Sequence, residues 1–242
     1  MPNKLSTTTR ILRVVLVVVA VVGLAFSIHY NQTLAQLRED HANLQAQVGV
    51  LKISDPSKVA ISYVPHSDDA VPPGVTNAHI WRYRIHIPAN YGFCHAFKSS
   101  LITADSPRAI GGGGSSWNSP KPEAEQMVAT LALFKSEGRW LFSRTTGSGS
   151  STSSLPNDLQ LDSLDDFVVE TAVSADDPSR VFDPDEAICL FRLREKEVAK
   201  KRNGKDEKGF YRGVSLYMHS EKRKDAFTAW ASGKAESMDE AE

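Results

Sequence analysis

The sequence predicts a mainly β protein with an N-terminal transmembrane helix, which continues into a short coiled-coil-like stalk and is followed by an antiparallel β-sandwich or jelly-roll-like domain. Three patterns predict this class: an apolar run near the N-terminus, a heptad-like repeat behind it, and a series of short segments in which apolar and polar residues alternate. The 242 residues leave room for one medium-sized domain beyond the anchor and stalk.

Residues 11–29 are predicted to form a transmembrane signal-anchor helix. About 18 of these residues are apolar apart from Arg13, which is roughly 27 Å of helix. Lys4, Arg10 and Arg13 make the N-terminal flank basic, so the positive-inside bias places residues 1–10 in the cytoplasm and the rest of the chain outside. We therefore expect a single-pass cell-membrane protein that contacts the lipid bilayer through residues 11–29. A cleavable signal peptide is the alternative, because it has the same signature.

Residues 30–54 are predicted to extend this helix as a coiled-coil-like stalk. The seam residues, spaced three and four apart, are Leu34, Leu37, His41, Leu44, Val48 and Leu51. All but the histidine are apolar, which is the a/d pattern of a coiled coil. Pro56 then stops the helix. The seam indicates either self-association or a monomeric spacer, and the sequence leaves both open.

Residues 55–224 are predicted to form the β-rich outer domain. Eight strands are expected at residues 58–64, 81–87, 93–97, 126–135, 139–144, 167–173, 188–193 and 210–218. Turn residues at 88–92 and 136–138 predict two hairpins, and a charged loop with a turn at 203–204 connects the last two strands.

Three other segments lack the alternation of a strand. The Gly/Ser-rich tracts 111–116 and 147–154 are expected to be loops, and residues 225–242, which are small, polar and acidic at the end, are expected to form a flexible tail. Neither Gly/Ser tract has the Lys-Ser/Thr end of a phosphate-binding loop.

Several of these features occur together in a known group of proteins. The single span and heptad stalk are followed by the segments Asp55 to Val59, Trp81 to Pro88 and Phe134 to Trp140. Over residues 10–145, this combination resembles uncharacterised single-pass membrane proteins of planctomycete-type bacteria. The resemblance implies a bacterial envelope setting and supplies no activity.

The charge of the chain is segregated. The formal net charge is −1, yet residues 192–224 hold twelve Lys or Arg against five Asp or Glu. Within this segment, the loop residues Lys200, Lys201, Arg202 and Lys205 are a candidate anion-binding site for envelope polymer or lipid headgroups, with a solvated loop tip as the alternative. The predicted location outside the cytoplasm argues against nucleic acid as the partner.

The two cysteines, Cys94 and Cys189, exclude a disulfide-rich scaffold and a zinc-finger array. Both lie in predicted strands with apolar neighbours. They form either one disulfide across the fold, if export oxidises them, or two separate buried thiols.

The sequence contains no recognisable catalytic, cofactor-binding or metal-binding set. The densest cluster of candidate metal ligands comprises His79, His86, Cys94 and His95, but Cys94 and His95 are neighbours on a strand and point to opposite faces, so only part of the set can converge. We therefore expect a non-catalytic β domain that binds an envelope protein or polymer without a cofactor. The alternatives are an envelope hydrolase on a β scaffold and a structural or assembly scaffold that acts through the stalk.

Overall fold

The computed structural model describes residues 55–65, 76–146, 149–156, 163–199 and 209–241, together with single residues at 22, 23, 26, 30, 33, 34, 36, 51, 53, 159 and 161. The chain divides into two compact units, residues 1–48 and 49–242. The single residues described between 22 and 36 are helical. No helix in the described part of the chain is long and apolar enough to cross a membrane. Most of the predicted anchor and stalk lies outside the described residues.

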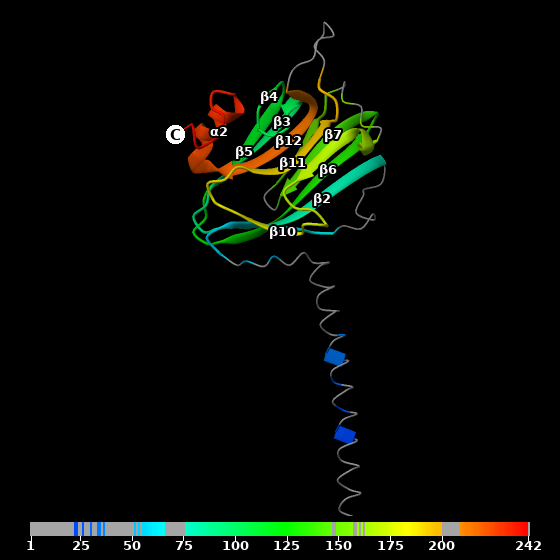
Figure 1. Ribbon diagram of the computed structural model, residues 1–242, viewed down its shortest axis with the longest axis vertical. Helices are drawn as coiled ribbons and strands as arrows, with labels where there is room; N and C mark the ends of the chain where they lie inside the picture. Colours follow the sequence, from blue (N-terminus) through cyan, green and yellow to red (C-terminus); the bar gives the residue numbers. More distant parts are fainter. Residues whose placement is uncertain are drawn as a thin grey trace, which may run out of the picture. The chain divides into compact units, whose positions relative to one another are not determined.

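Antiparallel strands form most of the second unit, which confirms the mainly β prediction (Figure 1). The strands are β1 (Val59–Tyr63), β2 (Thr76–Ile87), β3 (Phe93–Thr103), β4 (Ala109–Ile110), β5 (Gly113–Asn118), β6 (Glu125–Ser136), β7 (Arg139–Thr146), β8 (Gly149–Ser154), β9 (Phe167–Thr171), β10 (Ser179–Phe182), β11 (Ile188–Glu195) and β12 (Phe210–Ser220). Short 3₁₀ turns, η2 (Leu164–Asp166) and η3 (Glu221–Arg223), precede β9 and the helix α2 (Lys224–Ala231).

The strands that the structure describes make two sheets. Sheet A has the order β10-β1-β2-β6-β7-β8, and sheet B has the order β4-β3-β12-β11-β9, with β5 also paired to β3. All eight strands expected from the sequence are present, because alternation marks a strand that is buried on one face.

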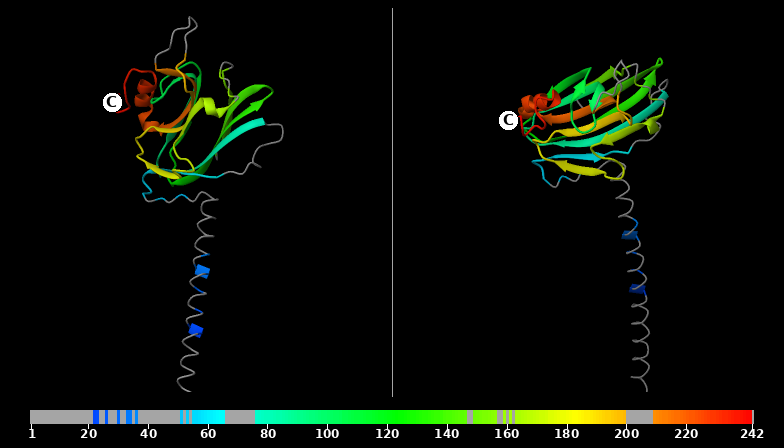
Figure 2. Two further views of the ribbon diagram at one scale, coloured as in Figure 1. Left: turned by 45° about the vertical axis from the view of Figure 1, so that its right-hand side comes forward. Right: turned by 45° about the horizontal axis from the view of Figure 1, so that its top comes forward.

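The two sheets pack face to face over one apolar core, as the two layers in Figure 2 show. Trp81 on sheet A meets Phe191 on sheet B with ring centroids 4.6 Å apart. Phe142 on sheet A stacks on Phe97 of sheet B at 5.2 Å. Inward-facing residues at every second position, such as Tyr83 on β2, are fully buried in this core. β7 therefore lies over β3, and β2 over β11.

The C-terminal residues are not the flexible tail that the sequence predicted. Helix α2 packs Phe227 against Tyr217, on the face of β12 that points away from sheet A, with ring centroids 5.9 Å apart. Met238 is also buried in this outer cluster. Burying a side chain such as Phe227 contributes about 1.5–3 kcal/mol, and the buried Ala226 and Met238 add to the apolar contact that holds α2 on the sheet. Composition alone missed this because only a few apolar residues carry the contact.

One of the two predicted hairpins is present, and the last two predicted strands also pair. Strands β6 and β7 pair across Glu137 and Gly138, whose φ angles of 50° and 77° match the left-handed residues of a type I′ turn. Strands β11 and β12 also pair. The predicted hairpin across residues 88–92 is wrong: β2 pairs with β1 and β6, whereas β3 pairs with β12, β4 and β5. The turn at 88–92 carries the chain from one sheet to the other.

The Gly/Ser-rich tracts are edge strands and not loops. β5 pairs with β3 at one end of sheet B, and β8 pairs with β7 at one end of sheet A. Both β4 and β5 pair with β3, and the ladder is interrupted between them. Two residues at this interruption have positive φ angles, Ser100 at 92° and Gly111 at 130°. Edge strands need little apolar side-chain packing, so their sequences carry no alternation.

Candidate functional site

The sequence predicts an anion-binding site in the basic loop between β11 and β12. Lys200, Lys201, Arg202 and Lys205 all lie outside the described residues. The strands on either side, β11 and β12, pair as expected.

Both cysteines are free thiols in the structure. Cys94 lies opposite His219 of β12, and Cys189 lies opposite Tyr217 of the same strand. β12 therefore separates the two cysteine strands by two interstrand spacings, about 9–10 Å, and a disulfide needs Cα atoms about 4.4–6.8 Å apart. The disulfide expectation is thus replaced by its alternative, two separate thiols. Burial raises the pKa of both thiols, which keeps them protonated at neutral pH.

The histidine cluster also separates. His86 lies on sheet A, where its Nε2 atom is 3.2 Å from the carbonyl oxygen of Pro56, and His95 lies on sheet B. Within the described ranges, no group of three or more His, Cys, Asp or Glu residues could hold a metal ion.

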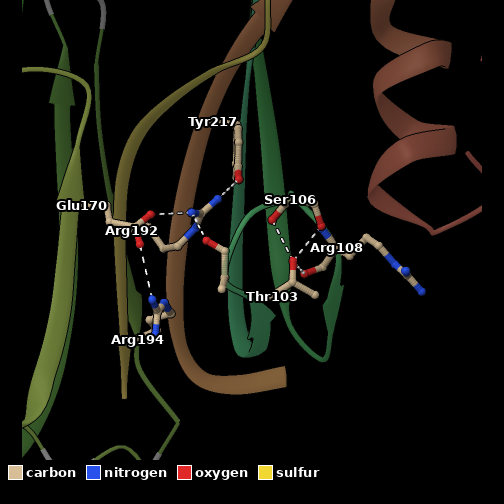
Figure 3. Close-up of polar contacts among 8 residues, drawn as sticks. Thr103, Ser106, Arg108, Glu170, Arg192, Arg194 and Tyr217 are labelled. Atoms are coloured by element: carbon tan, nitrogen blue, oxygen red, sulfur yellow. Dashed lines mark hydrogen bonds and ion pairs between the residues drawn. The ribbon is translucent and has the colours of Figure 1, made fainter. Parts of the chain in front are cut away.

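A buried arginine organises the outer face of sheet B (Figure 3). A bulge in β11 between Cys189 and Phe191 adds one residue, so Cys189 and Arg192 point to the same face although they are three positions apart. The Arg192 guanidinium donates to Glu170 Oε2, the Tyr217 hydroxyl and the backbone carbonyl of Ala104. Only 6% of its side chain is exposed. These contacts use the hydrogen-bond donors of Arg192 within the protein and connect β9, β11 and β12.

Arg144 on β7 has a different environment. It follows Trp140 and Phe142 at alternate positions, so its side chain points inward between the two sheets. Its Nη2 atom donates to Ser116 Oγ at 2.8 Å and thereby connects β7 of sheet A to the edge strand β5 of sheet B. Arg144 takes part in none of the ion pairs that form among the described residues.

A cavity of about 310 Å³ opens beside Arg144 between the two edge strands. Its floor is apolar and comes from Phe97, Phe142 and Leu216. Its walls are Gly113, Gly114, Ser99, Ser115, Ser116, Ser151, Ser153 and Ser154. Ser151 and Ser153 lie directly opposite Arg144 and Phe142 in the pairing of β7 and β8. The lining therefore combines one cation with many hydroxyl groups and contains no carboxylate.

Burial governs the electrostatics of this cavity. Desolvation lowers the pKa of Arg144, although a guanidinium remains charged at any physiological pH. His95 lies opposite Ser116 on β3 and is buried. Burial, helped by the nearby charges of Arg144 and His219, lowers the pKa of His95 to about 3, so its imidazole is neutral. Arg144 is the only charged side chain among the residues that line the cavity.

No protein-family model, curated protein or solved structure matches this chain. Function is therefore inferred from the geometry and chemistry of the cavities.

A second cavity, of about 490 Å³, lies on the other side of β5, between that strand and α2. Lys98, Lys224 and Trp117 line it, together with the same Gly113 to Ser116 segment. Trp117 is 68% exposed, which is unusual for a large aromatic residue. The first cavity has one cation in its lining and this one has two lysines, and neither lining contains a carboxylate.

The sequence contained one signal for the first cavity. Arg144 is the last residue of the predicted strand 139–144, on the same face as Trp140 and Phe142, so a charge stands at an inward-facing position. Such a position indicates a buried or cleft-facing charge. The composition of the two Gly/Ser tracts predicts loops, so the sequence gives no indication of the cavity walls that they form.

Proposed function

We propose that this chain is a membrane-anchored extracytoplasmic protein whose β domain binds an anionic partner, either a protein or an acidic polymer of the cell envelope. The observation that supports anion binding is Arg144, a partly buried cation with no carboxylate partner among the described residues, beside a cavity lined by hydroxyl groups.

The geometry of a guanidinium suits this role. It offers five N–H donors, and the contact with Ser116 uses one of them. A carboxylate, sulfate or phosphate accepts two parallel hydrogen bonds from such a group, and charge-assisted bonds are about twice as strong as neutral ones. The serine hydroxyl groups around Arg144 can donate to the remaining oxygens of an anion. An anion bound in this cavity would thus supply the negative charge that Arg144 lacks among the described residues.

The membrane anchor is the second part of the proposal. Its support is the uncharged sequence within residues 11–29 and the basic flank before it. A single anchor would hold the binding domain at high local concentration near envelope ligands. The stalk at residues 30–54 would set the distance from the membrane, and its seam would add self-association if the helices pair.

The hydrolase alternative has weaker support. A serine nucleophile needs an adjacent base, and the imidazole that lies opposite Ser116 belongs to His95. With a pKa of about 3, this imidazole is too weak a base to take a proton from a serine hydroxyl at neutral pH.

The proposal is tested by calorimetric titration of the full chain, held in nanodiscs of neutral lipid, with octaglutamate and octagalacturonate. Arg144→Gln removes the cation, and Arg139→Gln removes an exposed cation from the same strand as a matched control. A charge-assisted bond contributes about 1.5–3 kcal/mol, so we expect Kd for at least one probe to rise roughly 10- to 100-fold in the first variant and to stay within about twofold in the second. Equal affinities of wild type and Arg144→Gln for every probe would contradict anion binding at this site.

A further inference from the structure

The free side of β5 is an unpaired strand edge between the two cation-lined cavities. Among the described residues, β5 pairs only with β3. The backbone N–H of Ser99 donates to Gly112 O, and hydrogen-bonded pairs alternate along an antiparallel ladder. Residues 114, 116 and 118 therefore bond to β3, whereas Ser115 and Trp117 direct their N–H and C=O groups away from it.

This edge lacks the features that usually block pairing. Natural edge strands carry charged residues, prolines or bulges that prevent another strand from adding. Edge strand β10 contains Arg180, and edge strand β9 contains Glu170. β5 reads Gly-Gly-Ser-Ser-Trp-Asn, with no charge and no proline. Ser115 and Trp117 are also exposed, so an incoming strand can reach their backbone groups.

The cavities lie where the side chains of an added strand would point. Ser116 faces Arg144 and the first cavity, whereas Trp117 lines the second cavity on the opposite face. Side chains of an extended peptide alternate between the faces of a sheet in the same way. One set would lie over Arg144, and the other over Lys98 and Lys224.

We propose that the partner is an extended acidic peptide that adds to β5 as a further strand of sheet B. Its backbone pairs with Ser115 and Trp117, and its carboxylates point alternately toward Arg144 and toward the two lysines. Backbone pairing provides affinity in this mode of recognition, and alternate side-chain pockets provide specificity. The acidic character follows from charge complementarity, because both cavity linings contain cations and no carboxylate. This inference rests on the proposed anion-binding function and specifies its ligand.

The test distinguishes the contribution of backbone hydrogen bonds to peptide affinity from the contribution of the carboxylate charges. The probe is acetyl-Thr-Glu-Glu-Val-Glu-Glu-Thr-amide with a fluorescent label, titrated against the full chain in neutral nanodiscs by anisotropy. Two further peptides carry N-methyl groups on every even-numbered or every odd-numbered residue, which removes the N–H donors along one edge and retains all the charges. We expect one methylated peptide to bind at least tenfold more weakly than the parent and the other to bind within about threefold, because only one edge of the peptide faces β5.

Protein variants complete the design. Arg144→Gln and the double variant Lys98→Gln, Lys224→Gln should each weaken the parent peptide at least fivefold, and Arg139→Gln should not. Equal binding of the parent and both methylated peptides would overturn strand addition, while sensitivity to Arg144→Gln would leave anion binding intact. Octagalacturonate binding at least tenfold tighter than the peptide, or dimers of this chain that exclude the peptide, would also overturn the inference. If neither anionic probe distinguishes wild type from Arg144→Gln, the proposed function fails as well.

Discussion

His95 should make the stability of the β domain depend on pH between its unfolded pKa of 6.5 and its folded pKa of about 3. Its imidazole is buried opposite Ser116, and the charges of Arg144 and His219 further disfavour protonation. Its pKa therefore falls from 6.5 to about 3 on folding. The neutral side chain contributes stability that is fully present above pH 6.5. This stability is lost as the pH falls toward 3, because the unfolded chain binds a proton that the folded chain does not.

The size of this effect is set by the one proton that the unfolded chain binds at His95 and the folded chain does not. Each pH unit below the unfolded pKa costs about 1.4 kcal/mol, so lowering the pH from 6.5 to 5 should reduce the free energy of unfolding by about 1.5–2 kcal/mol through His95 alone. The assay is urea unfolding followed by tryptophan fluorescence, because all four tryptophans lie between residues 81 and 230. His95→Gln is the perturbation, and it retains a neutral polar side chain that does not titrate.

The quantity compared is the change in the free energy of unfolding between pH 6.5 and pH 5, measured separately for wild type and for His95→Gln. Burial also lowers the pKa of His219 and of His79, but these groups are present in both proteins and cancel. We expect wild type to lose about 1.5 kcal/mol more than His95→Gln between pH 6.5 and 5. Parallel pH profiles for the two proteins would refute a buried neutral His95.

Three further predictions follow from the fold and the sequence. Alkylation of the unfolded protein without reductant should label both Cys94 and Cys189, and labelling that requires reductant would contradict the strand order. Glu170→Ala should cost about 1–3 kcal/mol of stability by leaving the buried Arg192 without a carboxylate, and a loss below about 0.5 kcal/mol in urea unfolding would show that the pair is solvated. The chain should remain in the membrane fraction after high-salt and alkaline washes through residues 11–29, whereas release into the supernatant would contradict the anchor.

The interior of the β domain was predictable because its strands follow a simple rule. Trp81, Tyr83 and Ile85 alternate with charged residues, and the structure places these three side chains in or against the core. Alternation reports which face of a strand is buried, but it carries no information about which strand is the neighbour. This is why the turn residues at 88–92 predict a hairpin, although in the structure they connect two different sheets.

The candidate site was less predictable because glycine and serine form its walls. β5 and β8 are held in place by backbone hydrogen bonds to one neighbouring strand and not by packing of apolar side chains. Their sequences therefore look like those of flexible loops. Arg144 was visible as a charge on the apolar face of its strand. The cavity beside it depends on β5 lying over β8, a juxtaposition of segments about 35 residues apart that local patterns do not encode.

The central claim, that Arg144 binds an anionic partner, is tested most directly by measuring the reactivity of this one side chain. The full chain in neutral nanodiscs is modified with phenylglyoxal, which reacts with arginine, and the rate at each arginine is followed by peptide mass spectrometry with and without saturating acidic peptide or octagalacturonate. Binding at the site should slow the modification of Arg144 at least fivefold and leave exposed Arg139 unchanged. An unchanged rate at Arg144 under saturation, or equal slowing at both arginines, would contradict the claim.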